Sequence, residues 1–112
     1  MSKRLSEYLD HLKGLVVGTS IKSDFAVKSV TNDSRRCRPG SIFVAVSGAK
    51  NDGHRFIPAA IAAGAEAIVH ENDIVENVPG VSLICVRKSY PAYARLCEVF
   101  HDFPASKMTL VG

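Results

Sequence analysis

The 112-residue sequence lacks the marks of several large classes of protein. No apolar run approaches the roughly 20 residues that a membrane span needs. The first residues, MSKRLSEYLDHLKG, have no apolar signal-peptide core. The cysteines, Cys37, Cys85 and Cys97, are few and do not have the spacing of a metal site. We therefore expect a cytoplasmic protein with reduced thiols and no membrane partner.

Motifs for several kinds of chemistry are also missing. The sequence contains neither G-x-G-x-x-G nor G-x-x-x-x-G-K-[ST], so the Rossmann fingerprint and the P-loop are absent. The four histidines do not stand at metal-ligand spacing from Cys, Asp or Glu, and no acidic pair suits acid–base catalysis. Cys37 is expected to be exposed beside Arg36 and Arg38, which would lower its pKa, but no base is identifiable near it. We expect no metal site and no catalytic residue here.

The charge balance permits an anionic partner without requiring one. The net charge is +3, and hydrophobic residues make up 46% of the chain, as in an ordinary soluble domain. Basic residues are spread along the sequence, and only Arg35, Arg36 and Arg38 cluster. A nucleic-acid-binding protein more often has a basic stripe or interleaved aromatic residues. A small-anion or RNA-binding module that uses these arginines stays open as the alternative function.

The most informative stretch is Val30–Gly53, VTNDSRRCRPGSIFVAVSGAKNDG. Its centre, IFVAV, is rich in β-branched and aromatic residues and is bounded by turn formers, which predicts a buried strand. A polar loop precedes this strand and a second polar loop, with glycines, follows it. Two polar loops at the ends of one buried strand are a common way to display a small binding site.

The rest of the chain predicts an α/β fold, with a small parallel or mixed sheet and helices packed on it. Pro58 suits the first turn of the middle helix, Gly64 suits its C-terminal end, and Ser89 suits the cap of the last helix. The strand, helix, strand order around that middle helix indicates a right-handed βαβ unit. Residues 15–24 are expected to be irregular. Helices are expected at 5–13, 55–63 and 90–101, and strands at 25–30, 41–46, 66–70, 81–86 and 108–112.

Residue types alone leave two interpretations of the polar loops. Asp33, Ser34 and Arg35 suit an ordinary turn, in which Asp and Ser bond to nearby backbone and Arg pairs with Asp. They also suit a ligand site, in which the Ser34 hydroxyl meets a polar ring edge while Asp33 and Arg35 shape the loop. The segment Gly48–Gly53 is either a plain connection or a backbone cradle for a ligand.

Motifs in order along the chain carry a family resemblance. They are D-S-R, then P-G-x-x-F-V-A-x-x-G, then D-G-x-x-F-I, then A-x-x-x-G-A. In this order and spacing they resemble the N-terminal domain of the Mur ligases, the ATP-dependent amino-acid ligases of peptidoglycan synthesis. The tail FHDFPASKMTLVG resembles the segment that leads into the ATP-binding P-loop. Among these ligases the chain is most similar to the MurE type, with the MurF type, which adds D-alanyl-D-alanine, as the alternative.

The resemblance implies a substrate and a set of contacts. A MurE-type ligase joins meso-diaminopimelate or L-lysine to UDP-N-acetylmuramoyl-L-alanyl-D-glutamate, and its N-terminal domain binds the uridine end. Carried over by position, Asn32 and Ser34 would contact the uracil and ribose. Asp33 and Arg35 would shape their loop. The remaining contacts with the uridine, partly through backbone groups, would come from Ala49, Lys50 and Asn51.

The resemblance also implies what the chain does not supply. ATP and Mg²⁺ belong to the complete enzyme, and their sites, with the residues that choose the amino acid, would lie in central and C-terminal domains. We therefore expect residues 1–112 to be the substrate-binding domain, cut before the P-loop domain. On its own it is expected to bind weakly, to need no cofactor and to catalyse no reaction.

Overall fold

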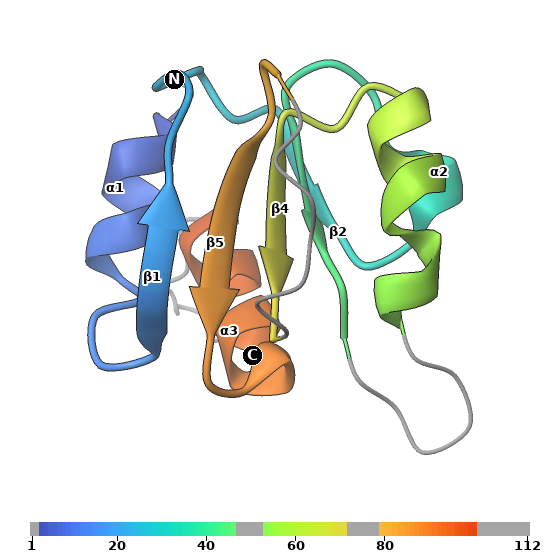
Figure 1. Cartoon of the computed structure of the whole chain (residues 1–112). Coiled ribbons are helices and arrows are strands. Elements are labelled where there is room, and N and C mark those ends of the chain that lie inside the picture. The colour runs from blue at the N-terminus through green and yellow to red at the C-terminus, as the bar shows by residue number, and fades with distance from the viewer. Residues whose placement is uncertain (1–2, 47–52, 72–78, 101–112) are drawn as a thin grey trace, which may run out of the picture.

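The computed structural model describes residues 3–46, 53–71 and 79–100, and within them one five-stranded sheet with helices on both faces (Figure 1). The α-helices are α1 (Leu5–Asp10), α2 (Ile57–Ala62) and α3 (Ser89–Phe100), with 3-10 helices η1 (Ser34–Arg36) and η2 (Gly53–Phe56). The strands are β1 (Val16–Ser20), β2 (Ser29–Thr31), β3 (Ser41–Val44), β4 (Ala67–His70) and β5 (Ser82–Val86). None of the described helices is long and apolar enough to span a membrane.

The sheet has the order β1-β5-β4-β3-β2, in which β2 to β5 are parallel and β1 is antiparallel to β5. Every residue of β3 and β4 is buried, which is the pattern of strands covered on both faces. The predicted α/β class, the mixed sheet and the βαβ unit are thereby confirmed. Helix α2 connects β3 to β4, with Pro58 in its first turn and Gly64 after it at φ +113°.

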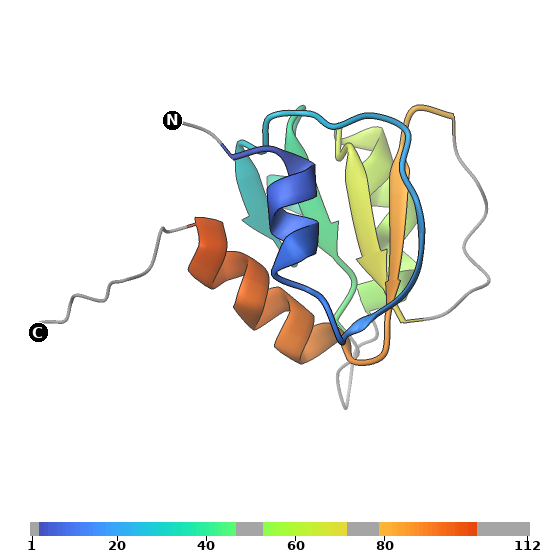
Figure 2. The same ribbon diagram turned by 90° about the vertical axis from the view of Figure 1, so that its left-hand side faces the viewer.

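Alternating residues of each strand feed two cores on opposite faces of the sheet. Helices α1 and α3 pack on the face that presents Ile42 and Val44, while α2 packs on the face that presents Phe43 and Ile68. Figure 2 shows α1 and α3 together on one side of the strands, with α2 behind them. The domain is therefore a three-layer α/β/α sandwich.

The structure corrects the predicted path between the first helix and the central strand. Val16–Ser20, expected to be irregular, is edge strand β1. The strand expected at 25–30 is confined to Ser29–Thr31, and Ala26 makes only an isolated bridge to Arg4. Pairing with β5 holds β1 in place although most of its residues are exposed, so no local alternation marks it.

Smaller corrections concern the helices. The first helix ends at Asp10 rather than Lys13. The apolar spacing of the last helix predicts a buried stripe of Tyr93, Leu96, Cys97 and Phe100, but the helix buries Ala92, Leu96 and Val99, so its buried face is rotated from that prediction. Tyr93 and Phe100 pack at the border of that face and stay partly exposed. The strand predicted at 108–112 lies outside the described residues.

Candidate functional site

The two predicted polar loops start from the same edge of the sheet. β2 and β3 are neighbouring parallel strands, so the segments that follow their C-terminal ends leave on the same side. Asn32 follows β2 directly. Val46 follows β3, and its carbonyl accepts a hydrogen bond of 2.9 Å from the backbone N–H of Gly53. The sheet topology therefore brings the starting points of both loops together.

The loop after β2 is held in shape by its own side chains. The Asp33 backbone N–H donates to Thr31 Oγ1 at 3.0 Å, and the Arg35 N–H donates to Asp33 Oδ1 at 2.9 Å. The Arg35 guanidinium also donates to both Asp33 carboxylate oxygens, each at 3.1 Å. These bonds from Arg35 lower the pKa of the Asp33 carboxyl. The turn chemistry predicted for Asp33 and Arg35 is thus present in the structure.

Asn32 and Ser34 differ from their neighbours in this loop. Asn32 is exposed and Ser34 is half-buried. Neither side chain has a hydrogen-bond partner among the residues that the structure describes. The loop is therefore braced by Asp33 and Arg35, while the amide of Asn32 and the hydroxyl of Ser34 remain available to a ligand.

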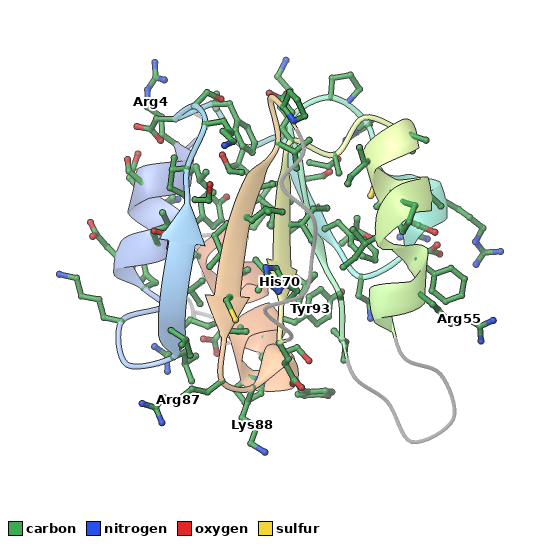
Figure 3. All side chains as sticks on the ribbon, viewed as in Figure 1. Arg4, Arg55, His70, Arg87, Lys88 and Tyr93 are labelled. Atoms are coloured by element: carbon green, nitrogen blue, oxygen red, sulfur yellow. The ribbon has the colours of Figure 1, made fainter. Side chains whose placement is uncertain are left out.

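Ser34 faces a hollow of about 500 Å³ whose far wall is an aromatic ring. The ring belongs to Phe56, which is 42% exposed at the end of η2. The Arg55 guanidinium lies 5.7 Å from the centre of this ring, and Figure 3 shows Arg55 projecting outward beside η2 and α2. Sequence reasoning assigned no role to Phe56, although it is the aromatic residue of the D-G-x-x-F-I motif. The hollow is lined by Asn32, Asp33, Ser34, Arg35 and Phe56.

A second hollow, also of about 500 Å³, shares Asn32 and Asp33 with the first. It lies between the free edge of β2 and helix α3. Its lining residues are Ser29, Val30, Thr31, Asn32, Asp33, Arg36, Arg38 and Tyr93. The arginine cluster seen in the sequence is therefore divided, with Arg35 on the Ser34 side and Arg36 and Arg38 on the α3 side.

Three of the predicted ligand contacts lie outside the described residues. These are Ala49, Lys50 and Asn51, and of the proposed cradle Gly48–Gly53 only Gly53 is among the described residues. The described part of the site thus brings together Asn32, Asp33, Ser34 and Arg35.

The expectation that Cys37 is exposed and acidic is wrong. Cys37 is 8% exposed and packs with Phe43 and Ile57 in the core beneath α2. Burial raises the pKa of its thiol to about 11, and the nearby Asp33 charge acts in the same direction. The 3-10 turn directs Cys37 inward while Arg36 and Arg38 stay in solvent, so their charges do not activate it.

The donor groups in the described ranges do not suit a metal centre. No set of three His, Cys, Asp or Glu residues within residues 3–46, 53–71 and 79–100 could hold a metal ion.

The fold and the hollows define a class first. This is an α/β domain with polar hollows at the carboxyl ends of its parallel strands, where such folds commonly bind ligands. Residues 26–103 match the family model described as Mur ligase family, catalytic domain. The chain belongs to the Mur ligase family, and the predicted resemblance is confirmed.

Individual relatives sharpen the comparison. The UDP-N-acetylmuramoyl-L-alanyl-D-glutamate–2,6-diaminopimelate ligase of Caldanaerobacter subterraneus is 36% identical over 104 residues, which cover 93% of this chain and 21% of the relative. The ligase of the same name from Bacteroides fragilis is 39% identical over 89 residues, which cover 80% of this chain and 18% of the relative. The chain thus spans about a fifth of the length of the curated relatives it matches.

Solved structures support the fold. A crystal structure of MurF from Acinetobacter baumannii superposes with a TM-score of 0.68 over 85% of this chain and 20% of that chain, at 19% identity. MurF from Thermotoga maritima in complex with ADP gives a TM-score of 0.54 at 34% identity, covering 65% of this chain and 16% of that chain. The first likeness shows the shared fold alone.

Proposed function

We propose that this chain is the uridine-nucleotide-binding domain of a ligase that adds the third amino acid to UDP-N-acetylmuramoyl-L-alanyl-D-glutamate. Diaminopimelate is the amino acid in the names of the curated relatives, and L-lysine is the other residue that a MurE-type ligase adds. The observation that carries the proposal is the braced loop after β2. It holds Asn32 and Ser34 beside a hollow, and neither side chain forms a hydrogen bond with another described residue.

The proposed contacts divide between polar and apolar groups. The Ser34 hydroxyl both donates and accepts, so it suits the mixed donor and acceptor edge of uracil. The Asn32 amide offers the same choice to the ribose or the base. Phe56 supplies an apolar wall for a flat ring, and aromatic faces stack on nucleobases without needing a particular base. Base selectivity therefore falls to the polar groups. Further contacts are proposed from Ala49, Lys50 and Asn51 in the second loop.

The complete ligase is proposed to need central and C-terminal domains in addition to this one. ATP and Mg²⁺ would there activate the substrate carboxylate for attack by the incoming amine. The part of this chain in that reaction is to hold the nucleotide end of the substrate at a fixed place. Binding by the chain alone is expected at about 0.1–1 mM, because it makes only some of the substrate contacts.

An amide NMR titration with UDP, with GDP as the control ligand, tests the proposal. UDP should shift the signals of Asn32–Arg35 and Phe56, and GDP should not. Ser34→Ala should weaken UDP binding by about three- to tenfold, since it removes one hydrogen bond. The matched control is Ser20→Ala on β1, at the opposite edge of the sheet, which should bind as the unchanged protein does. Equal responses to UDP and GDP would show that the site reads phosphate only and would end the uracil assignment.

The D-alanyl-D-alanine-adding type is the second candidate, because the Thermotoga maritima MurF is 34% identical over its aligned part. Both types would use the uridine site, so nucleotide binding does not separate them. Activity of the complete ligase with diaminopimelate, L-lysine or D-alanyl-D-alanine does. The RNA-binding alternative has less support, because Arg35 forms an ion pair with Asp33. Only two of the three clustered arginines then remain to bind a phosphate backbone.

A further inference from the structure

The hollow between β2 and α3 has features that the uridine proposal does not use. Asn32 and Asp33 are the two residues that it shares with the hollow lined by Ser34 and Phe56. One wall is the outer edge of β2, which pairs with β3 on its other side only. The opposite wall is α3, which packs beside β2 and contributes Tyr93. We call this hollow the β2–α3 groove.

The β2–α3 groove contains two arginines whose guanidinium groups form no ion pair with a described residue, although the charge of Arg36 helps to lower the pKa of the nearby Asp33 carboxyl. Arg36 and Arg38 are exposed, and in the described parts of the chain neither has an ion-pair or hydrogen-bond partner for its guanidinium. The groove's own carboxylate, Asp33, accepts hydrogen bonds from Arg35 on both of its oxygens and is paired with that charge. The net field in the groove is therefore positive.

Tyr93 brings a hydroxyl group to the same space. Burial raises the pKa of this phenol, as does its hydrogen bond with the Cys97 side chain, while the charge of Arg36 acts to lower it. The hydroxyl therefore stays protonated at neutral pH and is able to donate. Sulfur is a weak acceptor, so a phosphate oxygen is a better partner for this hydroxyl than Cys97 is. The groove thus combines two planar guanidinium forks, one O–H donor and the unpartnered Asn32 amide.

We propose that the β2–α3 groove is a second ligand site, which binds a phosphate-class oxyanion through Arg36, Arg38 and the hydroxyl of Tyr93. Guanidinium groups bind phosphate through paired, charge-assisted hydrogen bonds, and this geometry favours phosphate over a monovalent halide. A volume of about 500 Å³ is in the range of small-molecule sites, so the groove holds a diphosphate with its water. An acidic protein segment is less suited, because β2 offers an edge of only three residues.

Two sources supply this chemistry. One is the diphosphate of the nucleotide whose base occupies the Ser34 hollow, and the other is a separate phosphate compound. The anion site does not depend on the uridine proposal, because none of its three binding side chains contacts the Ser34 hollow.

Titration of the 112-residue chain with inorganic pyrophosphate, without nucleotide, tests the proposal. Pyrophosphate should shift signals of Thr31, Arg36, Arg38 and Tyr93 and leave those of Phe56 in place. Arg36→Gln and Arg38→Gln should each weaken binding by about three- to tenfold, and added salt should weaken it further. Arg87→Gln is the matched control. It removes an equal charge from the end of β5, where Figure 3 shows Arg87 pointing into solvent.

Tyr93→Phe gives a milder second variant, since it removes only the hydroxyl and should weaken binding by about two- to fivefold. The same titration on UDP-saturated protein separates the two sources. Pyrophosphate that still binds indicates a separate compound, and pyrophosphate that UDP displaces indicates the nucleotide's own diphosphate. The proposal is overturned by a lack of response up to about 10 mM pyrophosphate. It is equally overturned by binding that Arg36→Gln and Arg38→Gln reduce no more than Arg87→Gln does.

Discussion

Gly53 shows how a single residue joins the fold to the site. It is the first residue of η2, and its N–H donates to the carbonyl of Val46, just after β3. A Cβ atom placed on Gly53 would lie 2.8 Å from the Val46 nitrogen and 2.9 Å from the Val46 oxygen. These are backbone atoms of the segment that leaves β3, so they have little freedom to move aside. The absence of a side chain at this position allows the close approach.

Gly53→Ala should therefore destabilise the protein by about 1–3 kcal/mol, because the new methyl group collides with backbone. Urea unfolding followed by circular dichroism measures the change. Gly18→Ala on β1 is the control, since nothing lies within 4 Å of a Cβ there and its φ is not positive. Equal stability of the two variants would contradict the steric account of Gly53.

Tyr8 gives the stability of the protein an alkaline limit. Its side chain is 1% exposed, and burial, with the Glu7 charge, raises the pKa of the phenol from 10.0 to about 12. Below pH 10 the phenol is neutral in both states, so it adds no pH dependence. Between pH 10 and 12 the unfolded chain loses this proton first, and stability falls as the pH rises.

Tyr8→Phe should make the unfolding free energy fall less steeply between pH 10 and 12. The slope should change by up to the equivalent of one bound proton per molecule. Unfolding free energies measured by urea titration at several pH values give this slope. Tyr90→Phe removes a phenol that is 69% exposed and serves as the comparison. An unchanged slope in Tyr8→Phe would mean that the phenol becomes solvated before the protein unfolds.

At the scale of elements, Glu71 connects the end of β4 to the start of α3. Its Oε2 accepts from the Ser89 backbone N–H at 2.6 Å and from the Ser89 hydroxyl at 2.8 Å. A carboxylate at this position bonds to a free helix N–H and complements the positive end of the helix dipole. The helix begins one residue earlier than predicted, so Ser89 is its first residue, and its hydroxyl donates to Glu71 instead of capping the helix itself.

Glu71→Ala should cost about 1–2 kcal/mol of stability, the range for losing a helix N-terminal cap. Native-state hydrogen exchange should show the loss first in the amides of α3. Glu98→Ala is the matched control, because Glu98 is an exposed residue on the outer face of the same helix. Comparable losses in both variants would assign the effect to charge alone rather than to the cap.

The elements also show which parts of the fold are predictable from sequence. β3, β4, β5 and α2 were predicted because their apolar runs and turn residues are local signals. β1 was not, because its strand conformation comes from pairing with β5, in which Val16 is opposite Val86, 70 positions further along the chain, and not from its own pattern.

The candidate site divides in the same way. The roles of Asp33 and Arg35 in the turn were predictable, because both act within a few residues of each other. The burial of Cys37 and the exposure of Phe56 were not. Each depends on how η1, α2 and the sheet pack together, which neither residue's neighbours in sequence determine.

At the scale of the whole molecule, one sheet carries two cores and two hollows. The α1–α3 core and the α2 core lie on opposite faces of the same strands, so each helical layer depends on the one sheet for half of its core. Both hollows lie around the loop that follows β2. Most of the polar side chains around these hollows are therefore carried by one loop at the carboxyl end of β2.

We expect the 112-residue chain to release no ADP above background from ATP when it is mixed with Mg²⁺, UDP-N-acetylmuramoyl-dipeptide and diaminopimelate. The reason is that its sequence has no P-loop motif to hold the nucleotide phosphates. A coupled ADP assay with a complete ligase as the positive reference makes the measurement. Turnover by the chain alone would show an ATP site that follows none of these patterns.

The shape of β1 has a consequence for how the protein behaves in concentrated solution. β1 is an outer strand, and its register with β5 shifts between Val16 and Gly18, leaving Val17 63% exposed at the irregularity. A straight outer strand would invite a second copy to extend the sheet, the first step of polymerisation. The irregular backbone at Val17 interrupts the ladder that such growth would copy, and it favours a dispersed protein over a fibre.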